Sequence, residues 1–398
     1  MAAQALDVAA VQGLVVRGYG RLPAARYLLG EIEDVAATRE WLARLPVATG
    51  GPHAGDSAVN VAFTAPGLRR LAGDVAEEFS REFVEGMTTE HRRRLLRDDP
   101  ADWRWGNEPV DVLLLAYGAD EEALAAHGLG PGVRLVRELD TIPLEPHEHF
   151  GFRDGISQPR LAELGGAPAR DGVAAGEFVL GHRNEYGRLT PHPPLGRDGS
   201  YLVLRQLEQD VDGFWEWCRA AAPDAPERLA EKLVGRRRDG TPLVPAADLN
   251  DFAYFHADPH GLHCPIGAHV RRANPRDTLD PEPGTERSVA VNRRHRLLRR
   301  GRQYGTAPGE RGLHFICLVA NISRQFEFVQ HSWLNDPQFN GLYDHPDPLL
   351  GPGGGTFAIQ AEPVRERYTG LPRFVTVRGG AYFFLPGVRA LRSLAAPA

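Results

Sequence analysis

The amino-acid sequence predicts an α+β fold, with helices packed on one face of a sheet. Apolar residues alternate on a period of two in several short segments, which is typical of strands. Between these segments, Asp and Thr residues precede stretches with helical periodicity, at the positions where helix-capping residues stand. The first third of the chain runs strand, helix, strand, strand, helix, strand, and the last third has a similar rhythm. Two similar α+β halves are therefore predicted.

The elements of the first third are bounded by capping residues. Asp34 and Asp120 are predicted helix N-caps, and Thr64 followed by Pro66 marks another helix start. The predicted strands are 11–16, 27–32, 58–64, 110–117 and 133–138; the predicted helices are 35–45, one beginning at Thr64, and one running from Asp120 to Ala126.

The rest of the chain is less regular. Residues 165–205 are rich in Gly and Pro, which predicts a loop excursion of the second domain. Phe326, Val329 and Trp333 stand at helical spacing. Two apolar runs, 374–377 and 382–385, flank Arg378-Gly379-Gly380 and predict a hairpin. The other predicted elements are strands at 201–207 and 313–320 and a helix at 211–222.

The composition is that of an ordinary globular protein. The chain has 398 residues, of which 42% are hydrophobic and 25% charged, with a formal net charge of −6. This balance indicates one large or two medium domains and no nucleic-acid partner. The three cysteines are too few for a disulfide framework. No apolar run is long enough to span a membrane, and no signal peptide is seen, so a cytoplasmic location is expected.

Three segments contain the candidate functional residues. Residues 151–159 read Gly-Phe-Arg-Asp-Gly-Ile-Ser-Gln-Pro and place Asp154 between two glycines. On its own this pattern is weak, because Asp and Gly also form ordinary turns. The second segment, 264–277, contains His269 in the setting Cys-Pro-Ile-Gly-Ala-His-Val-Arg. The third segment, 295–305, contains Arg299 in the frame Arg-x-Gly-x-x-Tyr-Gly.

In this order and these contexts, the three segments resemble the dye-decolourising (DyP-type) haem peroxidases. Residues 199–211 and 377–384 fit the same family, so the resemblance covers nearly the whole chain. It implies two ferredoxin-like domains of the dimeric α+β barrel superfamily. The N-terminal domain would span 8–138, and the C-terminal domain, 139–392, would bind one haem b and carry the Pro/Gly-rich insertion.

The resemblance also implies a reaction. The protein would reduce hydrogen peroxide and oxidise bulky aromatic donors, such as dyes and phenols, in one-electron steps. His269 would be the axial ligand of the haem iron, since a neutral imidazole suits that position. Asp154 would be the acid–base group that moves a proton between the two peroxide oxygens. Arg299 would stabilise the negative charge on the departing oxygen. The resemblance further implies that copies of the chain can associate into a homo-oligomer.

Further residues are expected around the haem. Leu313 and Phe315 match family positions on the distal face, where they would exclude water. Arg271 or Arg276 would pair with the haem propionates by charge. Ala381 stands where many members have Glu, and this difference bears on the proximal side if that Glu supports the axial ligand. The other predicted cofactor-binding residues are Ile156, Ser157 and Gln158.

Two other functions are consistent with the sequence. A haem-binding protein for haem or iron handling would use His269 but would need neither Asp154 nor Arg299. A haem-free protein would place a metal site around His147, His149 and His263. If bulky donors do not reach the haem, electrons would pass through surface aromatic residues, for which the candidates by residue type are Tyr304, Trp333 and Tyr343.

Overall fold

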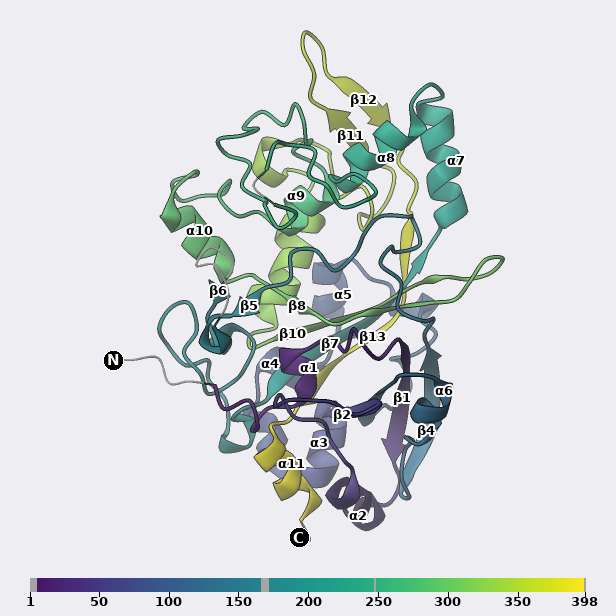
Figure 1. The fold of residues 1–398 in the computed structure, drawn as a ribbon, viewed down its shortest axis with the longest axis vertical. Helices are drawn as coiled ribbons and strands as arrows, with labels where there is room; N and C mark the ends of the chain where they lie inside the picture. Colours follow the sequence, from purple (N-terminus) through teal and green to yellow (C-terminus); the bar gives the residue numbers. More distant parts are fainter. Residues whose placement is uncertain (1–5, 166–171, 247, 397–398) are drawn as a thin grey trace.

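The computed structural model describes residues 6–165, 172–246 and 248–396. Its central element is a nine-stranded sheet built from both halves of the chain, with the order β4-β1-β3-β2-β13-β7-β10-β8 and β9 paired to β10 (Figure 1). Neighbouring strands of this sheet are antiparallel, which confirms the predicted α+β class. The strands are β1 (Ala24–Ile32), β2 (Ser57–Phe63), β3 (Val112–Gly118), β4 (Val133–Asp140), β7 (Ser200–Gln209), β8 (Leu298–Arg299), β9 (Arg302–Tyr304), β10 (Gly312–Val319) and β13 (Val375–Leu385).

Strand β13 joins the two halves of the sheet. It pairs with β7 along its whole length, from Val375 opposite Gln209 to Leu385 opposite Ser200. Near its end, Phe384 pairs with Phe63 of β2, which belongs to the N-terminal half. The halves therefore share one continuous sheet. The proposed division into domains 8–138 and 139–392 stays a prediction.

The two faces of the sheet are covered differently. On one face, apolar side chains of α2, α3, α4, α5 and α11 pack against the strands, as predicted for helices on one face. The opposite face is covered by α1 and by irregular segments such as the one around Val173 and Phe178. The helices are α1 (Gly13–Val16), α2 (Val35–Arg44), α3 (Ala65–Ala72), α4 (Arg81–Glu85), α5 (Glu90–Leu96), α6 (Glu121–Ala125), α7 (Val211–Ala221), α8 (Pro226–Val234), α9 (His269–Ala273), α10 (Glu286–Arg293), α11 (Val388–Ala395) and the π-helical segments η6 (Ser323–Glu327) and η7 (Val329–Leu334).

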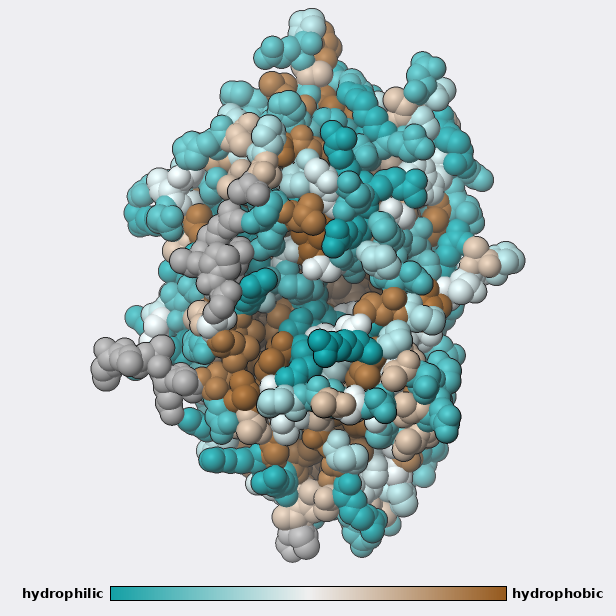
Figure 2. Space-filling model, viewed as in Figure 1, coloured by the Kyte–Doolittle hydropathy of each residue, from teal (hydrophilic) through white to brown (hydrophobic). Residues whose placement is uncertain are grey.

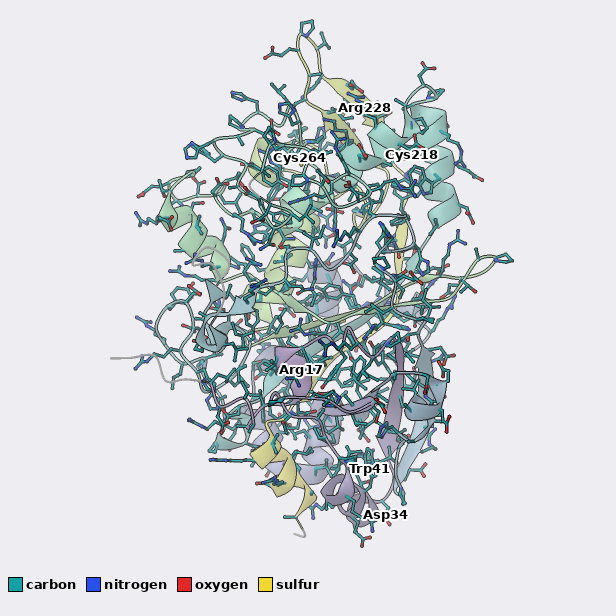
Figure 3. The ribbon with its side chains drawn as sticks, viewed as in Figure 1. Arg17, Asp34, Trp41, Cys218, Arg228 and Cys264 are labelled. Carbon is teal, nitrogen blue, oxygen red and sulfur yellow. The ribbon has the colours of Figure 1, made fainter. Side chains whose placement is uncertain are left out.

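The predicted N-caps are confirmed. Asp34 Oδ1 accepts hydrogen bonds from the amides of Ala36 and Ala37 at 2.9 and 3.0 Å, at the start of α2 (Figure 3). Thr64 Oγ1 accepts from the third residue after it at 3.2 Å, and Asp120 Oδ1 does the same at 2.9 Å. These side chains satisfy amides that the first turn of each helix leaves free.

Two predicted elements are wrong. Residues 11–16 form no strand, because Gly13–Val16 is the short helix α1. A brief apolar run does not distinguish a strand from a buried helical turn. Residues 374–385 form no hairpin, because β13 continues through Gly379 with a bulge after Val377. Gly379 is needed there for packing, since a Cβ atom would lie 2.3 Å from Nε1 of Trp105.

The remaining segments lie around the ends of the sheet. Two smaller sheets, β5 (Arg160–Leu161) with β6 (Gly172–Val173) and β11 (Thr356–Ile359) with β12 (Glu366–Thr369), flank the C-terminal half. Part of the predicted Gly/Pro-rich loop, 166–171, lies outside the described residues. Cys218, Cys264 and Cys317 are buried free thiols. Figure 3 labels Cys218 and Cys264. Among the helices of the described ranges, none combines the length and apolar character that crossing a bilayer requires.

Candidate functional site

A cavity of about 850 Å³ lies against the C-terminal half of the sheet. Alternate residues of three neighbouring strands form one wall, because side chains at every second position share a face of a sheet. Further lining residues come from α9, from η7 and from the loop that begins at Leu144. In Figure 2, brown apolar side chains gather around a hollow near the middle of the face shown. The alternating residues of this wall are Arg205, Leu207, Gln209, Leu313, Phe315, Val375 and Val377; the cavity lining also includes His314, Arg299, Arg302 and Gln303 from strands β8 to β10.

Asp154 reaches this cavity from a tight turn. Gly151 and Gly155 on either side have φ angles of 92° and 77°, a region that favours glycine. At Gly151 a Cβ atom would also lie 2.5 Å from Nη2 of Arg238. The Asp154 amide donates to the Pro146 carbonyl at 2.9 Å, which closes the turn. The Asp154 side chain stays 55% exposed, so the motif presents an accessible carboxylate.

Arg299 lies close to Asp154 on the wall of the cavity. Its Nη2 lies 4.0 Å from Oδ1 of Asp154 and donates to the Ile156 carbonyl at 2.6 Å. The Arg299 amide donates to Oε1 of Gln158 at 3.1 Å. The predicted residues Ile156 and Gln158 thus hold the arginine by its side chain and its backbone. Together these contacts bring an acid–base group and a fixed cation to one place.

The neighbouring arginines bond elsewhere. Arg296 donates to the Ser157 carbonyl at 3.0 Å. Arg300 donates to the carbonyls of Leu14 and Val15 at 2.8 and 3.2 Å, and so anchors α1. Arg302 donates to carbonyls of the segment 18–22. Of these arginines, Arg299 is the one whose guanidinium lies 4.0 Å from Asp154, and its role stays a prediction.

His269 enters the cavity from the first position of α9. Its Nδ1 lies 3.0 Å from Oδ2 of Asp347, whose side chain is 0% exposed. Since Nδ1 is engaged, Nε2 is the ring nitrogen available to a ligand. Asp347 Oδ1 also accepts from the amides of Leu349 and Leu350 at 3.0 and 2.8 Å. The arrangement fixes both the ring and its tautomer.

Asp347 stays ionised in this setting. Burial by itself would raise the pKa of Asp347, but the facing His269 and the charge of Arg272 lower it below its usual range. Sequence reasoning missed this residue, although an aspartate between Pro346 and Pro348 is a rigidly placed carboxylate.

Ala381 lies away from His269. It pairs with Leu204 in β13 and packs on the sheet face opposite the cavity. The expected effect of Ala381 on the proximal side is therefore not supported, because Asp347 already holds the second ring nitrogen of His269.

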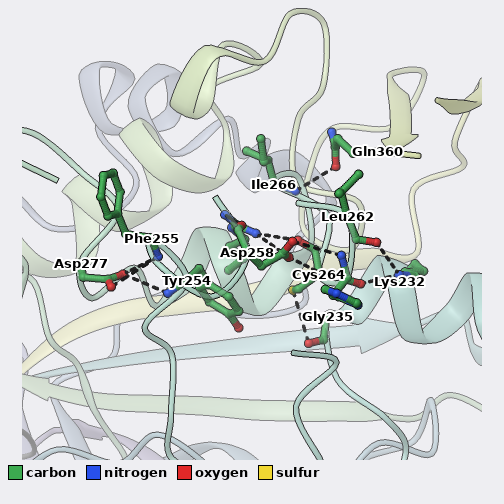
Figure 4. A network of polar contacts seen from close by, with 12 residues as sticks. Lys232, Gly235, Tyr254, Phe255, Asp258, Leu262, Cys264, Ile266, Asp277 and Gln360 are labelled. Atoms are coloured by element: carbon green, nitrogen blue, oxygen red, sulfur yellow. Dashed lines mark hydrogen bonds and ion pairs between the residues drawn. The ribbon is translucent and has the colours of Figure 1, made fainter. Parts of the chain in front are cut away.

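The structure does not bring Arg271 or Arg276 into the lining of the cavity. Arg271 is buried, where its Nη1 lies 3.2 Å from Oδ2 of Asp258 and donates to the Cys264 carbonyl at 2.7 Å. Figure 4 shows the network of polar contacts around Asp258 and Cys264. Arg276 donates to Oγ of Ser157 at 3.1 Å. Arg271 therefore holds the loop before α9, and Arg276 supports Ser157.

The alternative metal site is not formed. Within residues 6–165, 172–246 and 248–396, no group of three or more His, Cys, Asp or Glu side chains is arranged to hold a metal ion. His149 bonds through Nε2 to the Tyr304 carbonyl at 2.9 Å, and burial lowers its pKa.

Two of the three candidate surface aromatics are buried. Tyr304 and Trp333 lie inside the protein, and Trp333 lines the cavity. Tyr343 is 77% exposed. Residue type alone did not distinguish these environments.

The chain is similar to known proteins over most of its length. Residues 146–361, more than half of the chain, match the family described as "Dyp-type peroxidase, C-terminal". A dye-decolorizing peroxidase of Mycena epipterygia is 29% identical over 98% of this chain and 88% of its own length. Peroxidase 2 of Mycetinis scorodonius is 30% identical over 85% of this chain and 76% of its own length. The crystal structure of a DyP-type peroxidase from Anabaena sp. superimposes with a TM-score of 0.83 at 26% identity, covering 97% of this chain and 94% of the other. The chain therefore belongs to the Dyp-type peroxidase family.

Proposed function

We propose that this protein is a haem b peroxidase that reduces hydrogen peroxide and oxidises aromatic donors such as dyes and phenols. One observation carries the proposal: an imidazole anchored by a buried carboxylate shares a cavity with a carboxylate that faces an arginine. His269 with Asp347 supplies the first part, and Asp154 with Arg299 supplies the second.

The residues fit a haem. The cavity of about 850 Å³ is large enough for a flat macrocycle and is mostly apolar on the sheet side. His269 would hold the iron through Nε2, because Asp347 engages its other nitrogen. Leu313 and Phe315, which stand on the same face of β10, would keep water from the peroxide side. Arg271 and Arg276 stay outside this proposal, since neither lines the cavity.

The chain's own groups handle the protons and the charge. A bound haem would take the two oxidising equivalents of peroxide and pass them to donors one electron at a time. Asp154 would take a proton from one peroxide oxygen and return it to the other, which leaves as water. Arg299 would stabilise negative charge on the leaving oxygen, in a geometry already set by Ile156 and Gln158.

The first test uses haem-reconstituted protein mixed rapidly with hydrogen peroxide. A Soret band, a fast spectral change with peroxide and turnover of a phenol are expected. A Soret band without a peroxide response would favour haem or iron handling instead. Failure to take up haem at all would contradict both functions.

Replacing Arg299 by leucine is expected to lower the rate constant for peroxide by about 10²–10³-fold, as for the loss of one charge-stabilising group. Haem uptake should not change. Lysine at this position should restore part of the rate, because it returns the charge without the planar guanidinium. Arg153→Leu is the matched control, since Arg153 is an exposed cation that also lines the cavity. An equal loss in both variants would show that general cavity charge, rather than Arg299, is responsible.

Replacing Asp347 by asparagine is expected to weaken haem binding by about 10–100-fold. The uncharged amide is a weaker acceptor for His269, so the imidazole donates less electron density and the reduction potential should rise. Haem titration and a spectroelectrochemical potential measure the two effects. Asp344→Asn, an exposed residue of the same loop, is the control. An unchanged potential in Asp347→Asn would contradict the proposed role.

The cytoplasmic location and the homo-oligomer stay predictions. Sedimentation of the purified protein would test the second.

A further inference from the structure

A second carboxylate, Glu148, lies on the wall of the same cavity as Asp154. It stands at the start of the turn that carries Asp154 and has no role in the mechanism above. Its Oε2 accepts from the Phe150 amide at 2.9 Å, and its Oε1 accepts from the Phe152 amide at 3.0 Å. One side chain thus holds two peptide groups of the turn.

The backbone of Glu148 closes the same turn. Its amide donates to the Phe152 carbonyl at 2.9 Å, and its carbonyl accepts from the Gly151 amide at 2.8 Å. Residues 147 and 153 then form a bridge, and the Asp154 amide bonds to the Pro146 carbonyl. Because Asp154 follows Phe152 by two residues, the position of its carboxylate depends on the shape that Glu148 imposes.

Gln209 ties this turn to the sheet. Its Nε2 donates to Oε2 of Glu148 at 2.7 Å from strand β7. Gln209 is only 6% exposed, and its Oε1 has no hydrogen-bond partner, so the contact with Glu148 is what orients the amide. Three N–H donors therefore point at the two oxygens of Glu148. A carboxylate accepts from all of them, whereas a glutamine would turn an NH₂ group toward at least one donor.

Glu148 lies close enough to Asp154 to be affected by its charge. Burial raises the pKa of Glu148, and the nearby negative charge of Asp154 adds to this effect against the hydrogen bonds that lower it. The other ionisable groups of the turn and of the segments packed against it are His147, His149, Arg153, Arg238 and Arg311.

We propose that Glu148 is a positioning residue for the reaction with peroxide, acting through Asp154. It fixes the turn against β7 so that Asp154 stays opposite Arg299. This inference rests on the proposed peroxidase function and assigns a role to a residue outside the pair that would contact peroxide.

The test compares Glu148→Gln, Glu148→Asp and the wild type as haem-loaded proteins. In Glu148→Gln, kcat/KM for peroxide should fall roughly tenfold to a hundredfold, as expected for the loss of a charge-assisted contact. The kcat/KM for the phenol should not change, because donor oxidation does not depend on this turn. Glu148→Asp keeps both acceptor oxygens on a shorter side chain, so its peroxide constant should fall less than that of Glu148→Gln.

A readout independent of haem and turnover is hydrogen exchange of the haem-free proteins. The amides of Phe150 and Phe152 should exchange faster in Glu148→Gln, whereas amides within β7 should be unchanged. Glu145→Gln is the matched control: Glu145 is an exposed carboxylate of the same loop that also lines the cavity. It should leave the rates and the exchange unaltered.

Two results would overturn the inference: an unchanged peroxide constant in Glu148→Gln, or an equal fall in the phenol constant. If Glu148→Gln does not fold, Gln209→Leu removes one donor and keeps the carboxylate. It should lower the peroxide constant by a smaller factor, and an unchanged constant would again overturn the inference. A wild type that fails to react with peroxide would instead refute the proposed function, so the two failures are distinguishable.

Discussion

Replacing Asp154 by alanine is expected to slow the reaction with peroxide by about 10²–10⁴-fold, the usual contribution of a positioned acid–base group. The turn places this carboxylate in the cavity, 4.0 Å from Nη2 of Arg299, so its loss removes the proton acceptor and leaves the cation alone. Haem uptake and the Soret band should be retained, because Asp154 lies apart from the His269–Asp347 pair. Stopped-flow absorption after mixing with peroxide measures the rate constant directly.

Two further variants test whether the lower rate of Asp154→Ala comes from the loss of the proton-accepting carboxylate. Asp154→Asn keeps the shape of the side chain but cannot accept the proton, so it should be nearly as slow as alanine. Glu145→Gln removes an exposed carboxylate from the same cavity and should react at the wild-type rate. If Asp154→Asn reacted as fast as the wild type, the acid–base role would belong to another group.

Replacing His269 by glycine is expected to abolish stable haem binding. His269 is the residue whose Nε2 is left available toward the cavity while Asp347 fixes its Nδ1. Without it, haem would be held only by apolar contacts and would be lost on gel filtration. Haem titration followed by desalting measures the retained fraction.

Added imidazole gives this variant a specific control. The deleted ring leaves room beside the Asp347 carboxylate, so free imidazole should occupy it and restore part of the haem spectrum. His147→Gly should keep its haem, because His147 is an exposed residue of the Asp154 turn. Full haem retention by His269→Gly would show that another residue binds the iron.

Capping residues in the sequence correctly predicted where helices begin, because a cap depends only on residues close to it in the chain. Asp34 and Thr64 cap helices because their side chains bond to amides two or three residues away, which spacing in the sequence already indicates. Residues 374–385 were predicted as a hairpin because glycines often mark turns. Gly379 is needed in the strand for another reason: the indole of Trp105, which is distant in sequence, occupies the space beside it.

The residues of the site also divide into those that a sequence motif indicates and those that only the fold brings together. Asp154, His269 and Arg299 stand in recognisable motifs, and the structure gathers them around one cavity. Asp347 carries no motif, and only the fold shows that it lies beneath His269. Arg271 looked suited to an anionic partner by its charge. Its actual partner, Asp258, lies thirteen residues before it, and pairing of this kind depends on how a loop folds back.

The pairing of β13 has a consequence for how the protein is made. This strand follows β2 and β7 in the sequence by more than 160 residues, yet it lies between them and is their only common neighbour in the order of the sheet. Contacts between segments so far apart carry a large loop-closure cost and form slowly. During synthesis, the N-terminal strands emerge long before the segment that connects them to the cavity wall. We expect haem capture to be a late event of folding, so that a nascent chain ending before residue 375 would not retain the cofactor.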